Sequence, residues 1–217
     1  KNRGKNVPLL TVSNHASPLD DPCLLGAVIP LPMAALKPEL LRFSICAREI
    51  CFKNAALSTF FSLSKVMPII RGDGIDQKMF RLFQGRLAAG SWCHIFPEGQ
   101  CFQIGALSGR KGSRRQEIGR LKWGVGKLIA HSPVRPIVVP IFHTGMQNLM
   151  PLDPITRKSI HFWPRIGNVI TARCGPRIDV SDLIDAHERK FGKLEAYSTT
   201  SNSRESGRES TEAELAL

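Results

Sequence analysis

The stretch Leu9-Leu10-Thr11-Val12-Ser13-Asn14-His15-Ala16-Ser17-Pro18-Leu19-Asp20-Asp21 decides the fold of this 217-residue chain. Its apolar first half predicts a buried strand over residues 8–13. Its second half predicts a turn that leads into a helix near Pro18, because proline is favoured in the first turn of a helix. The strand therefore delivers His15, with Asp20 close behind it, to the point where the strand ends.

The spacing of His15 and Asp20 is compatible with a general base. A histidine has an unperturbed pKa of ~6.5, and a carboxylate on one ring nitrogen leaves the other free to take a proton. The sequence offers no obvious nucleophilic side chain to complete a triad, so we expect the nucleophile to be a hydroxyl of the substrate. Alternatively, His15 is a loop histidine beside an acid that caps a helix, which is also the simplest role for Asp21.

Short apolar segments alternate with amphipathic ones along the chain. Strands are expected at residues 8–13, 66–70, 92–96, 136–142 and 169–174, and helices near residue 18 and at 55–63, 76–89 and 122–130, while 39–48 could be either. This order predicts an α/β fold with a mixed, largely parallel sheet flanked by helices. His15, Arg71, Glu98 and His143 each follow an expected strand, and ligands of such sheets bind outside the carboxyl ends of the strands.

The charge balance is strongly basic, since thirty Lys and Arg residues against eighteen Asp and Glu residues give a net charge of +12. Such an excess suits an anionic bilayer surface or a nucleic acid. No run of Lys and Arg alternates with aromatic residues, which makes nucleic acid the less expected partner. No apolar run reaches the ~18–20 residues that span a bilayer, so we expect a monotopic protein that lies on a membrane.

One folded domain is expected over residues 1–196, with a basic, glycine-rich loop insert at about 103–120 and a disordered polar tail at 197–217. Because the first residue is Lys and not Met, the chain is expected to be a fragment or a processed product. The six cysteines form no CxxC pair, which argues against zinc and thioredoxin-type sites and favours buried free thiols in a reducing compartment. His94 is expected to be a core histidine.

Several short blocks resemble the glycerolipid acyltransferase superfamily and, within it, the tafazzin family of phospholipid–lysophospholipid transacylases that remodel cardiolipin. They are Thr11-Val12-Ser13-Asn14-His15 with Asp20-Asp21-Pro22, Ile50-Cys51-Phe52, Pro68-Ile69-Ile70-Arg71-Gly72, His94-Ile95-Phe96-Pro97-Glu98-Gly99, Leu121-Lys122-Trp123-Gly124, Ile137-Val138-Val139-Pro140-Ile141 and His143-Thr144-Gly145-Met146. The similarity runs from about residue 7 to 175. It implies an acyltransferase with the α/β fold expected above.

The resemblance also implies roles for individual residues. His15 would be the general base that deprotonates the free hydroxyl of a lysophospholipid, and Asp20 would orient it. Arg71 with Gly72 would bind the phosphate, and Glu98 with Gly99 would bind the substrate at the glycerol hydroxyls or by organising the phosphate site. These implied roles leave His143 open between a catalytic and a structural histidine.

Further contacts follow from local chemistry. Lys122 and Trp123 suit a headgroup or membrane contact, since Trp favours the headgroup boundary. The basic loop insert is either a second anion-binding element or a solvated insert. Backbone N–H groups near the helix start after His15 are expected to stabilise the oxyanion. No metal and no tightly bound cofactor is expected.

The resemblance implies a transacylase on mitochondrial membranes facing the intermembrane space. The nearest alternative is an acyl-CoA-dependent lysophospholipid acyltransferase, or an enzyme that acylates phosphatidylethanolamine, on the endoplasmic reticulum or another cytoplasm-facing membrane; acyl-CoA would then be a co-substrate. An alternative of another class is a non-catalytic module that binds anionic lipid or nucleic acid. A serine hydrolase is a poor fit because the chain lacks a GxSxG motif.

Overall fold

The computed structural model describes residues 4, 6–24, 29, 31–103, 121–153, 156, 158–161 and 163–193. The basic loop insert, apart from Gln103, and the polar tail at 197–217 lie outside these residues. Within the described part, no helix is both long enough and apolar enough to cross a membrane.

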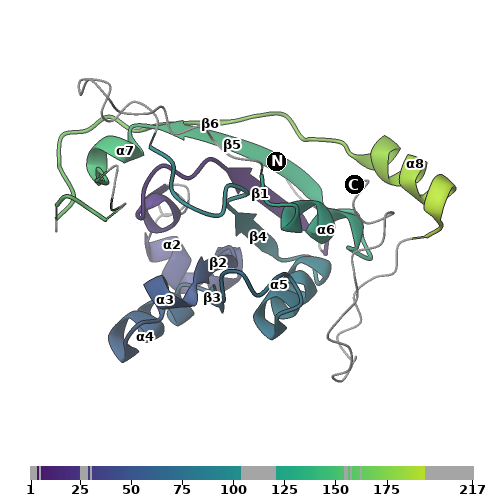
Figure 1. The fold of residues 1–217 in the computed structure, drawn as a ribbon, viewed down its shortest axis with the longest axis horizontal. Coiled ribbons are helices and arrows are strands. Elements are labelled where there is room, and N and C mark those ends of the chain that lie inside the picture. The colour runs from purple at the N-terminus through teal and green to yellow at the C-terminus, as the bar shows by residue number, and fades with distance from the viewer. Residues whose placement is uncertain are drawn as a thin grey trace.

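A four-stranded sheet in the order β4-β1-β5-β6 forms the centre of the fold (Figure 1). Strand β1 (Leu9–Ser13) pairs in parallel with both β4 (Trp92–Ile95) and β5 (Ile137–Thr144). Strand β6 (Thr171–Cys174) runs antiparallel to β5 at the edge. The predicted mixed, largely parallel sheet is therefore confirmed.

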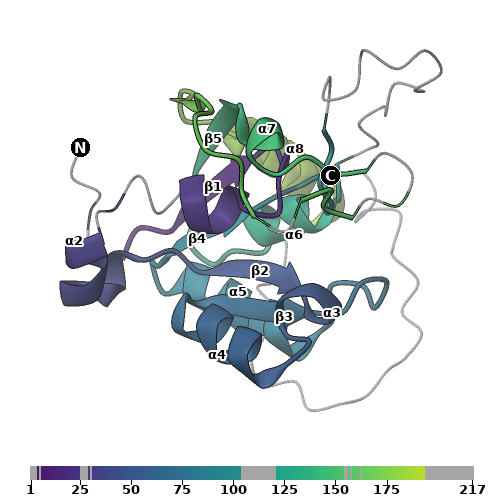
Figure 2. The same ribbon diagram turned by 90° about the vertical axis from the view of Figure 1, so that its left-hand side faces the viewer.

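A second, two-stranded parallel sheet continues this layer beyond β4. It consists of β2 (Ser44–Ala47) and β3 (Val66–Ile69), so the ambiguous region 39–48 contains a strand. Phe43 joins the two sheets, because its N–H donates to Trp92 O at 2.8 Å and its carbonyl accepts from His94 N–H at 2.8 Å. Figure 2 shows β2 and β3 with helices α3, α4 and α5 on the side of the molecule opposite β5 and α7.

The helices connect these strands and cover the sheet. They are the π-helix η1 (Asp20–Leu24), α2 (Leu31–Leu36), the 3₁₀-helix η2 (Pro38–Leu40), α3 (Arg48–Cys51), α4 (Ala55–Leu63), α5 (Lys78–Ala88), α6 (Gly124–Ala130), α7 (Met146–Leu149) and α8 (Ser181–Phe191). The expected helices at 55–63, 76–89 and 122–130 are present, the last two slightly shorter than predicted. Helices α2, α3, α7 and α8 were not predicted, because three of them are very short and α8 has few buried apolar positions.

The main core lies between the sheet and the helices α5 and α6. Phe83 and Leu87 of α5 and Leu128 of α6 pack with Leu10 of β1 and Cys93 of β4, and none of these side chains is more than 1% exposed. Burial of a side chain of this size contributes ~1.5–3 kcal/mol. This packing fixes β1 and β4, whose carboxyl ends carry His15 and Glu98.

The helix expected near Pro18 begins two residues later and forms a single π-helical turn at Asp20. The reason is local hydrogen bonding. The Asp20 carboxylate accepts from the N–H groups of Ala16 and Ser17, and Asp20 N–H donates to Ser17 O at 3.1 Å. These bonds hold residues 16–19 in a turn, so the helix begins only after it.

A disulfide joins Cys46, near the end of β2, to Cys51 in α3. The turn from strand to helix brings their Cα atoms to 6.2 Å, so the expectation of free thiols is wrong for this pair. Cys93, Cys101 and Cys174 are not disulfide-bonded.

His94 is a core histidine, as predicted. It is fully buried in β4 and exchanges hydrogen bonds with the Thr11 hydroxyl at Nδ1 (2.8 Å) and with the Ser13 hydroxyl at Nε2 (3.2 Å). Burial, which disfavours the charged ring, lowers the pKa of His94 to about 4. The ring is therefore neutral at physiological pH.

Protonation of His94 should make the stability of the protein depend on pH. In the unfolded chain His94 gains a proton as the pH falls below 6.5, whereas in the folded protein it gains this proton only near pH 4. The free energy of unfolding should thus fall across this window, and the His94→Gln variant should lack that part of the loss. Urea unfolding of parent and variant between pH 7 and pH 4 measures it; a difference between the two proteins that stays constant with pH would contradict the prediction.

Candidate active site

His15 and Asp20 form a hydrogen-bonded dyad at the carboxyl end of β1. His15 Nδ1–H donates to Asp20 Oδ2 at 2.9 Å, and the same oxygen accepts from the N–H groups of Ala16 (2.6 Å) and Ser17 (2.9 Å). Asp20 is fully buried, while the His15 side chain remains 20% exposed. The contact expected between these two residues is present, and it leaves Nε2 of His15 as the ring nitrogen that can accept a proton.

His143 lies beneath this dyad, within β5 and not after it as predicted. Its side chain is buried, and Nε2–H donates to Asn14 O at 2.9 Å while lying 3.6 Å from Asp20 Oδ2. The Asn14 side chain also bonds to both backbone groups of His143, each at 2.9 Å. Among the described residues, no hydrogen-bond partner faces Asp20 Oδ1 or His143 Nδ1. This arrangement clamps the ends of β1 and β5 together.

Phe96 and Glu98 form the other wall around His15. The Phe96 ring stacks on the imidazole with a centroid separation of 4.1 Å. Glu98 Oε2 accepts from the His15 N–H at 3.3 Å, and the residue is only 8% exposed. Burial raises the pKa of Glu98 above its ordinary value. The turn after β4 thus places a poorly solvated carboxyl against the peptide of His15.

We expected backbone N–H groups near the start of the helix to stabilise the oxyanion, but those of residues 15–17 are not available for this role. Their N–H groups are already engaged, His15 with Glu98 and the next two with the Asp20 carboxylate. Two further donors of the turn, the N–H groups of Leu19 and Asp20, bond to Ser17. The backbone of this turn orients Asp20 and has no spare donor at these positions.

Asp21 anchors a buried arginine and does not act as a helix cap. Arg42 Nη2 lies 2.7 Å from Asp21 Oδ2, Arg42 Nε–H donates to Asp21 Oδ1 at 3.0 Å, and Ser44 Oγ–H donates to Oδ2 at 2.7 Å. Arg42 is 6% exposed and also donates to Ser64 O. This network connects η1 to β2. The sequence alone did not indicate that Arg42 is buried or that it pairs with Asp21.

Cys101 is the residue of this site that the sequence did not reveal. Its Sγ lies 3.3 Å from His15 Nε2, the ring nitrogen that does not face Asp20. Burial raises the pKa of the Cys101 thiol to about 12, Asp20 and Glu98 add to this effect, and Arg71 opposes it. The thiol is therefore neutral beside the imidazole.

The segment after the Glu98 turn is hydrogen-bonded to the backbone of the His15 loop. Phe102 N–H donates to His15 O at 2.7 Å. The Gln103 amide donates to Ala16 O at 2.8 Å and to Met150 O at 2.9 Å, and its oxygen accepts from Leu152 N–H. These bonds fix the backbone that carries Cys101.

Arg71 and Gly72 follow β3 at the same edge of the sheet. The Arg71 side chain is about half exposed, and its Nε lies 3.5 Å from Glu49 Oε1. Its positive charge also acts on the site, where it partly offsets the rise in the pKa of Cys101. Gly72 has φ +86° with open space where a Cβ would lie. A left-handed turn, and not a close approach to another group in this structure, explains the glycine.

Gly99 brings Lys122 to the far side of the Glu98 turn. Gly99 has φ +69°, and a Cβ at this position would lie 3.1 Å from Lys122 Cγ. Lys122 N–H donates to Pro97 O at 2.7 Å. Trp123 is 54% exposed, with the Lys127 ammonium 4.7 Å above its ring. Lys122 and Trp123 therefore lie at the surface beside the site.

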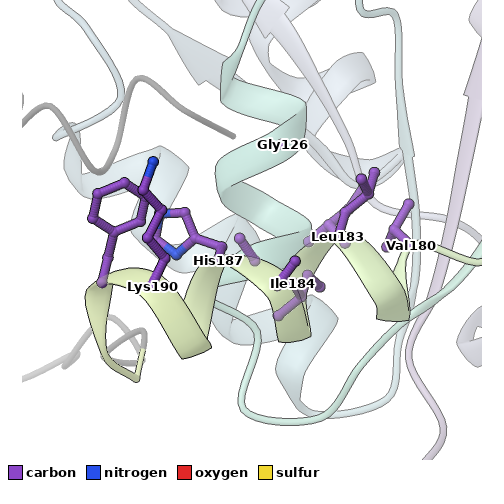
Figure 3. Close-up of a pocket in the computed structure, with 10 residues that line it drawn as sticks. Gly126, Val180, Leu183, Ile184, His187 and Lys190 are labelled. Atoms are coloured by element: carbon purple, nitrogen blue, oxygen red, sulfur yellow. The ribbon is translucent and has the colours of Figure 1, made fainter.

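A separate cavity of about 360 Å³ lies between α6 and α8 (Figure 3). Its lining is largely apolar and includes Leu183, Ile184 and His187 of α8, but no residue of the dyad region. Within the described part of the chain, no group of three His, Cys, Asp or Glu residues could hold a metal ion.

Comparison with known proteins gives concordant matches. A family model described as Acyltransferase matches residues 1–144. The chain is similar to an N-acylphosphatidylethanolamine synthase of Arabidopsis thaliana, 46% identical over 151 residues (70% of this chain, 49% of the relative). It is also similar to Tafazzin of Drosophila melanogaster, 38% identical over 183 residues (84% and 43%), and to Taffazin of Dictyostelium discoideum, 39% identical over 169 residues (75% and 55%). The chain spans about half the length of these relatives.

The buried carboxyl of Glu98 should reduce stability at neutral pH. Above pH 4.5 the unfolded carboxyl ionises first, whereas the folded one keeps its proton longer because burial raises its pKa. Unfolding is therefore favoured progressively as the pH rises, and the Glu98→Gln variant should be the more stable protein at pH 8. Urea unfolding from pH 4 to pH 8 should show this gain growing with pH; an equal difference at all pH values, or a loss at pH 8, would contradict it.

Proposed function

Because the chain belongs to the acyltransferase family, we propose that it moves a fatty acyl chain from a phospholipid to the free hydroxyl of a lysophospholipid. The observation that carries this proposal is the His15–Asp20 dyad, which leaves Nε2 without a carboxylate partner on a side chain that is 20% exposed. The relatives named tafazzin support a role in phospholipid remodelling, including that of cardiolipin.

His15 acts as the general base. Nε2 removes the proton of the attacking hydroxyl, and the oxygen then adds to the ester carbonyl of the donor. Collapse of the tetrahedral intermediate returns this proton from His15 to the departing lysophospholipid. Asp20 holds the Nδ1–H tautomer and stabilises the imidazolium that forms in between, since its buried carboxylate faces that proton at 2.9 Å.

Arg71 and Glu98 provide the substrate contacts. The Arg71 guanidinium, beside the left-handed turn at Gly72, is half exposed and would bind a phosphodiester. Glu98, on the turn made by Gly99, binds at the glycerol hydroxyls or organises the phosphate site from beside His15. Lys122 adds a positive charge at the far side of this turn.

The protein lies on an anionic membrane surface in a monotopic manner. Leu121 and Trp123 are 61% and 54% exposed beside Lys122, and the whole chain has a net charge of +12. Apolar and aromatic side chains beside lysines suit the headgroup boundary. By likeness to the tafazzins the membrane is mitochondrial and faces the intermembrane space, with the endoplasmic reticulum as the alternative.

A second candidate function is acyl transfer to the amine of phosphatidylethanolamine. It is favoured by the 46% identity to the Arabidopsis N-acylphosphatidylethanolamine synthase. The same dyad would serve, because an ammonium group must also lose a proton before its nitrogen can attack. The acyl donor could then be a phospholipid or acyl-CoA.

The His15→Ala variant should lose acyl transfer by at least ~10²-fold, because the general base is gone, while lipid binding remains. The assay supplies labelled lysophospholipid with intact phospholipid or with acyl-CoA, and in parallel supplies phosphatidylethanolamine as acceptor. His131→Ala, altered at the end of α6, is the control and should retain activity. Undiminished turnover by His15→Ala would exclude the mechanism, and transfer from acyl-CoA alone would exclude the transacylase.

The Trp123→Ala variant should bind anionic vesicles roughly tenfold more weakly, because loss of an interfacial indole is worth on the order of 1–2 kcal/mol. Trp123→Phe should keep most of the binding, since an aromatic ring remains at the boundary. Vesicle co-sedimentation measures both variants. Equal binding by Trp123→Ala and the parent would contradict a membrane contact at this position.

A further inference from the structure

The loop between α7 and β6 exposes four large apolar side chains to solvent. Its described residues are 158–161 and 163–170, and Ile160, Trp163, Ile166 and Val169 are each more than half exposed, with Ile166 at 96%. Single exposed apolar side chains are common on protein surfaces. Several large ones within one short loop indicate a surface that a partner covers.

We propose that this α7–β6 loop inserts its apolar side chains into the headgroup boundary of an anionic bilayer and so places the active site at the membrane surface. The inference rests on the proposed acyl transfer, because the substrates of that reaction are lipids of a bilayer. It adds a second point of membrane contact to the one proposed at Trp123, from a different part of the chain.

Backbone hydrogen bonds hold the loop in this exposed position. Ile160 N–H donates to Pro151 O at 3.0 Å, and Arg165 N–H donates to Leu149 O at 2.9 Å. The Asn168 amide donates to Arg165 O at 3.0 Å. The apolar side chains therefore face solvent from a backbone that is bonded to the rest of the fold. Such a loop loses little further conformational freedom when a membrane covers it.

Gly145 allows the end of the loop to pack against the start of α7. It has φ +94°, and a Cβ at this position would overlap Val169 O. A side chain larger than hydrogen therefore does not fit here. The sequence block His143-Thr144-Gly145-Met146 thus decides where the loop lies, in addition to contributing to the site.

Residues 149–152 connect the loop to the active site. Two of their carbonyls accept the loop bonds just described. The alternate residues, Met150 and Leu152, bond to the side chain of Gln103 at 2.9 Å and 2.8 Å, and that side chain also donates to Ala16 O of the dyad turn at 2.8 Å. Figure 1 shows the segment after α7 at the end of the molecule where β1, β4 and β5 also end. A loop that is fixed in a membrane therefore fixes the height of the dyad above the membrane.

The charge of this region favours an anionic partner. Between residues 154 and 178 the sequence contains five Lys or Arg residues and no Asp or Glu. Among them, Lys158, Arg165 and Arg173 are exposed. An anionic bilayer matches both features of the loop, because its headgroups attract the cations and its acyl chains take up the apolar side chains. Trp163 adds to this match, since an indole favours the headgroup boundary.

The test measures co-sedimentation of the full chain with vesicles of phosphatidylcholine and phosphatidylglycerol, and with vesicles of phosphatidylcholine alone. The variant combines Ile166→Ser with Val169→Ser. Leu183→Ser is the matched control, because Leu183 is also largely exposed and lies on α8, at the opposite end of the molecule (Figure 1). Circular dichroism checks that every variant is folded.

A second measurement locates Trp163 relative to the acyl chains. Phospholipids brominated on their acyl chains quench the emission of an inserted indole, and Trp163→Phe removes this indole while it keeps an aromatic ring. Comparison of the parent with Trp163→Phe on the same vesicles isolates Trp163 from Trp92 and Trp123. We expect the quenched part of the emission to be smaller in Trp163→Phe.

The variant with Ile166→Ser and Val169→Ser should bind anionic vesicles on the order of tenfold or more weakly, because two large apolar side chains no longer leave water. Its acyl transfer between vesicle lipids should fall to a similar extent. Transfer between short-chain lipids dissolved as monomers should stay at the parental rate, since no docking is needed. Leu183→Ser should match the parent in every assay, and the parent should bind vesicles of phosphatidylcholine alone more weakly.

Parental binding by the double variant, or equal quenching in the parent and in Trp163→Phe, would overturn the insertion of the loop and leave the proposed function intact. An equal loss of transfer from vesicle and monomeric lipids would also overturn it, because the loop would then shape the site itself. So would a dimer of the parent that dissociates in the double variant while vesicle binding is unchanged. Absence of transfer by the parent from every donor would contradict the proposed function, whereas the vesicle measurements would still decide on the loop.

Discussion

The site depends on one buried carboxylate, that of Asp20. Its oxygen Oδ2 accepts three N–H groups, two from the backbone of the preceding turn and one from the ring of His15. A charge with no exposed surface is stable only when donors replace the water that it has lost. The chain must therefore turn tightly at residues 16–19, and this turn fixes the tautomer of His15 and delays the helix.

The parallel pairing of β1 with β4 and β5 brings Glu98 and His143 to the site around this carboxylate. Strands that run in the same direction end at the same edge, so the residues after them meet there. Glu98 reaches the peptide of His15 from β4, and His143 reaches the peptide of Asn14 from β5. Burial raises the pKa of the Glu98 carboxyl, and such shifted values cluster at functional sites.

The alternation of apolar strands and helices was sufficient to predict the fold class. The strands that the sequence indicated most clearly, β1, β3, β4 and β5, are short and rich in apolar residues, so their burial shows in their composition. Strand β2 was ambiguous because it lies in a region where a 3₁₀-helix, a strand and α3 follow one another within a few residues. Helix α8 was missed because only Ile184 and His187 are buried along it.

The sequence by itself determined the pairing of His15 with Asp20, because the two residues are only five positions apart and a single turn brings them together. It also determined which residues follow the strands. It did not determine what those residues touch. Asp21 pairs with Arg42, 21 positions away, Cys46 bonds to Cys51, and Cys101 reaches His15 across 86 positions. Contacts between distant segments arise only when the sheet and its packed helices bring the strand ends together, so these pairings became visible in the tertiary structure alone.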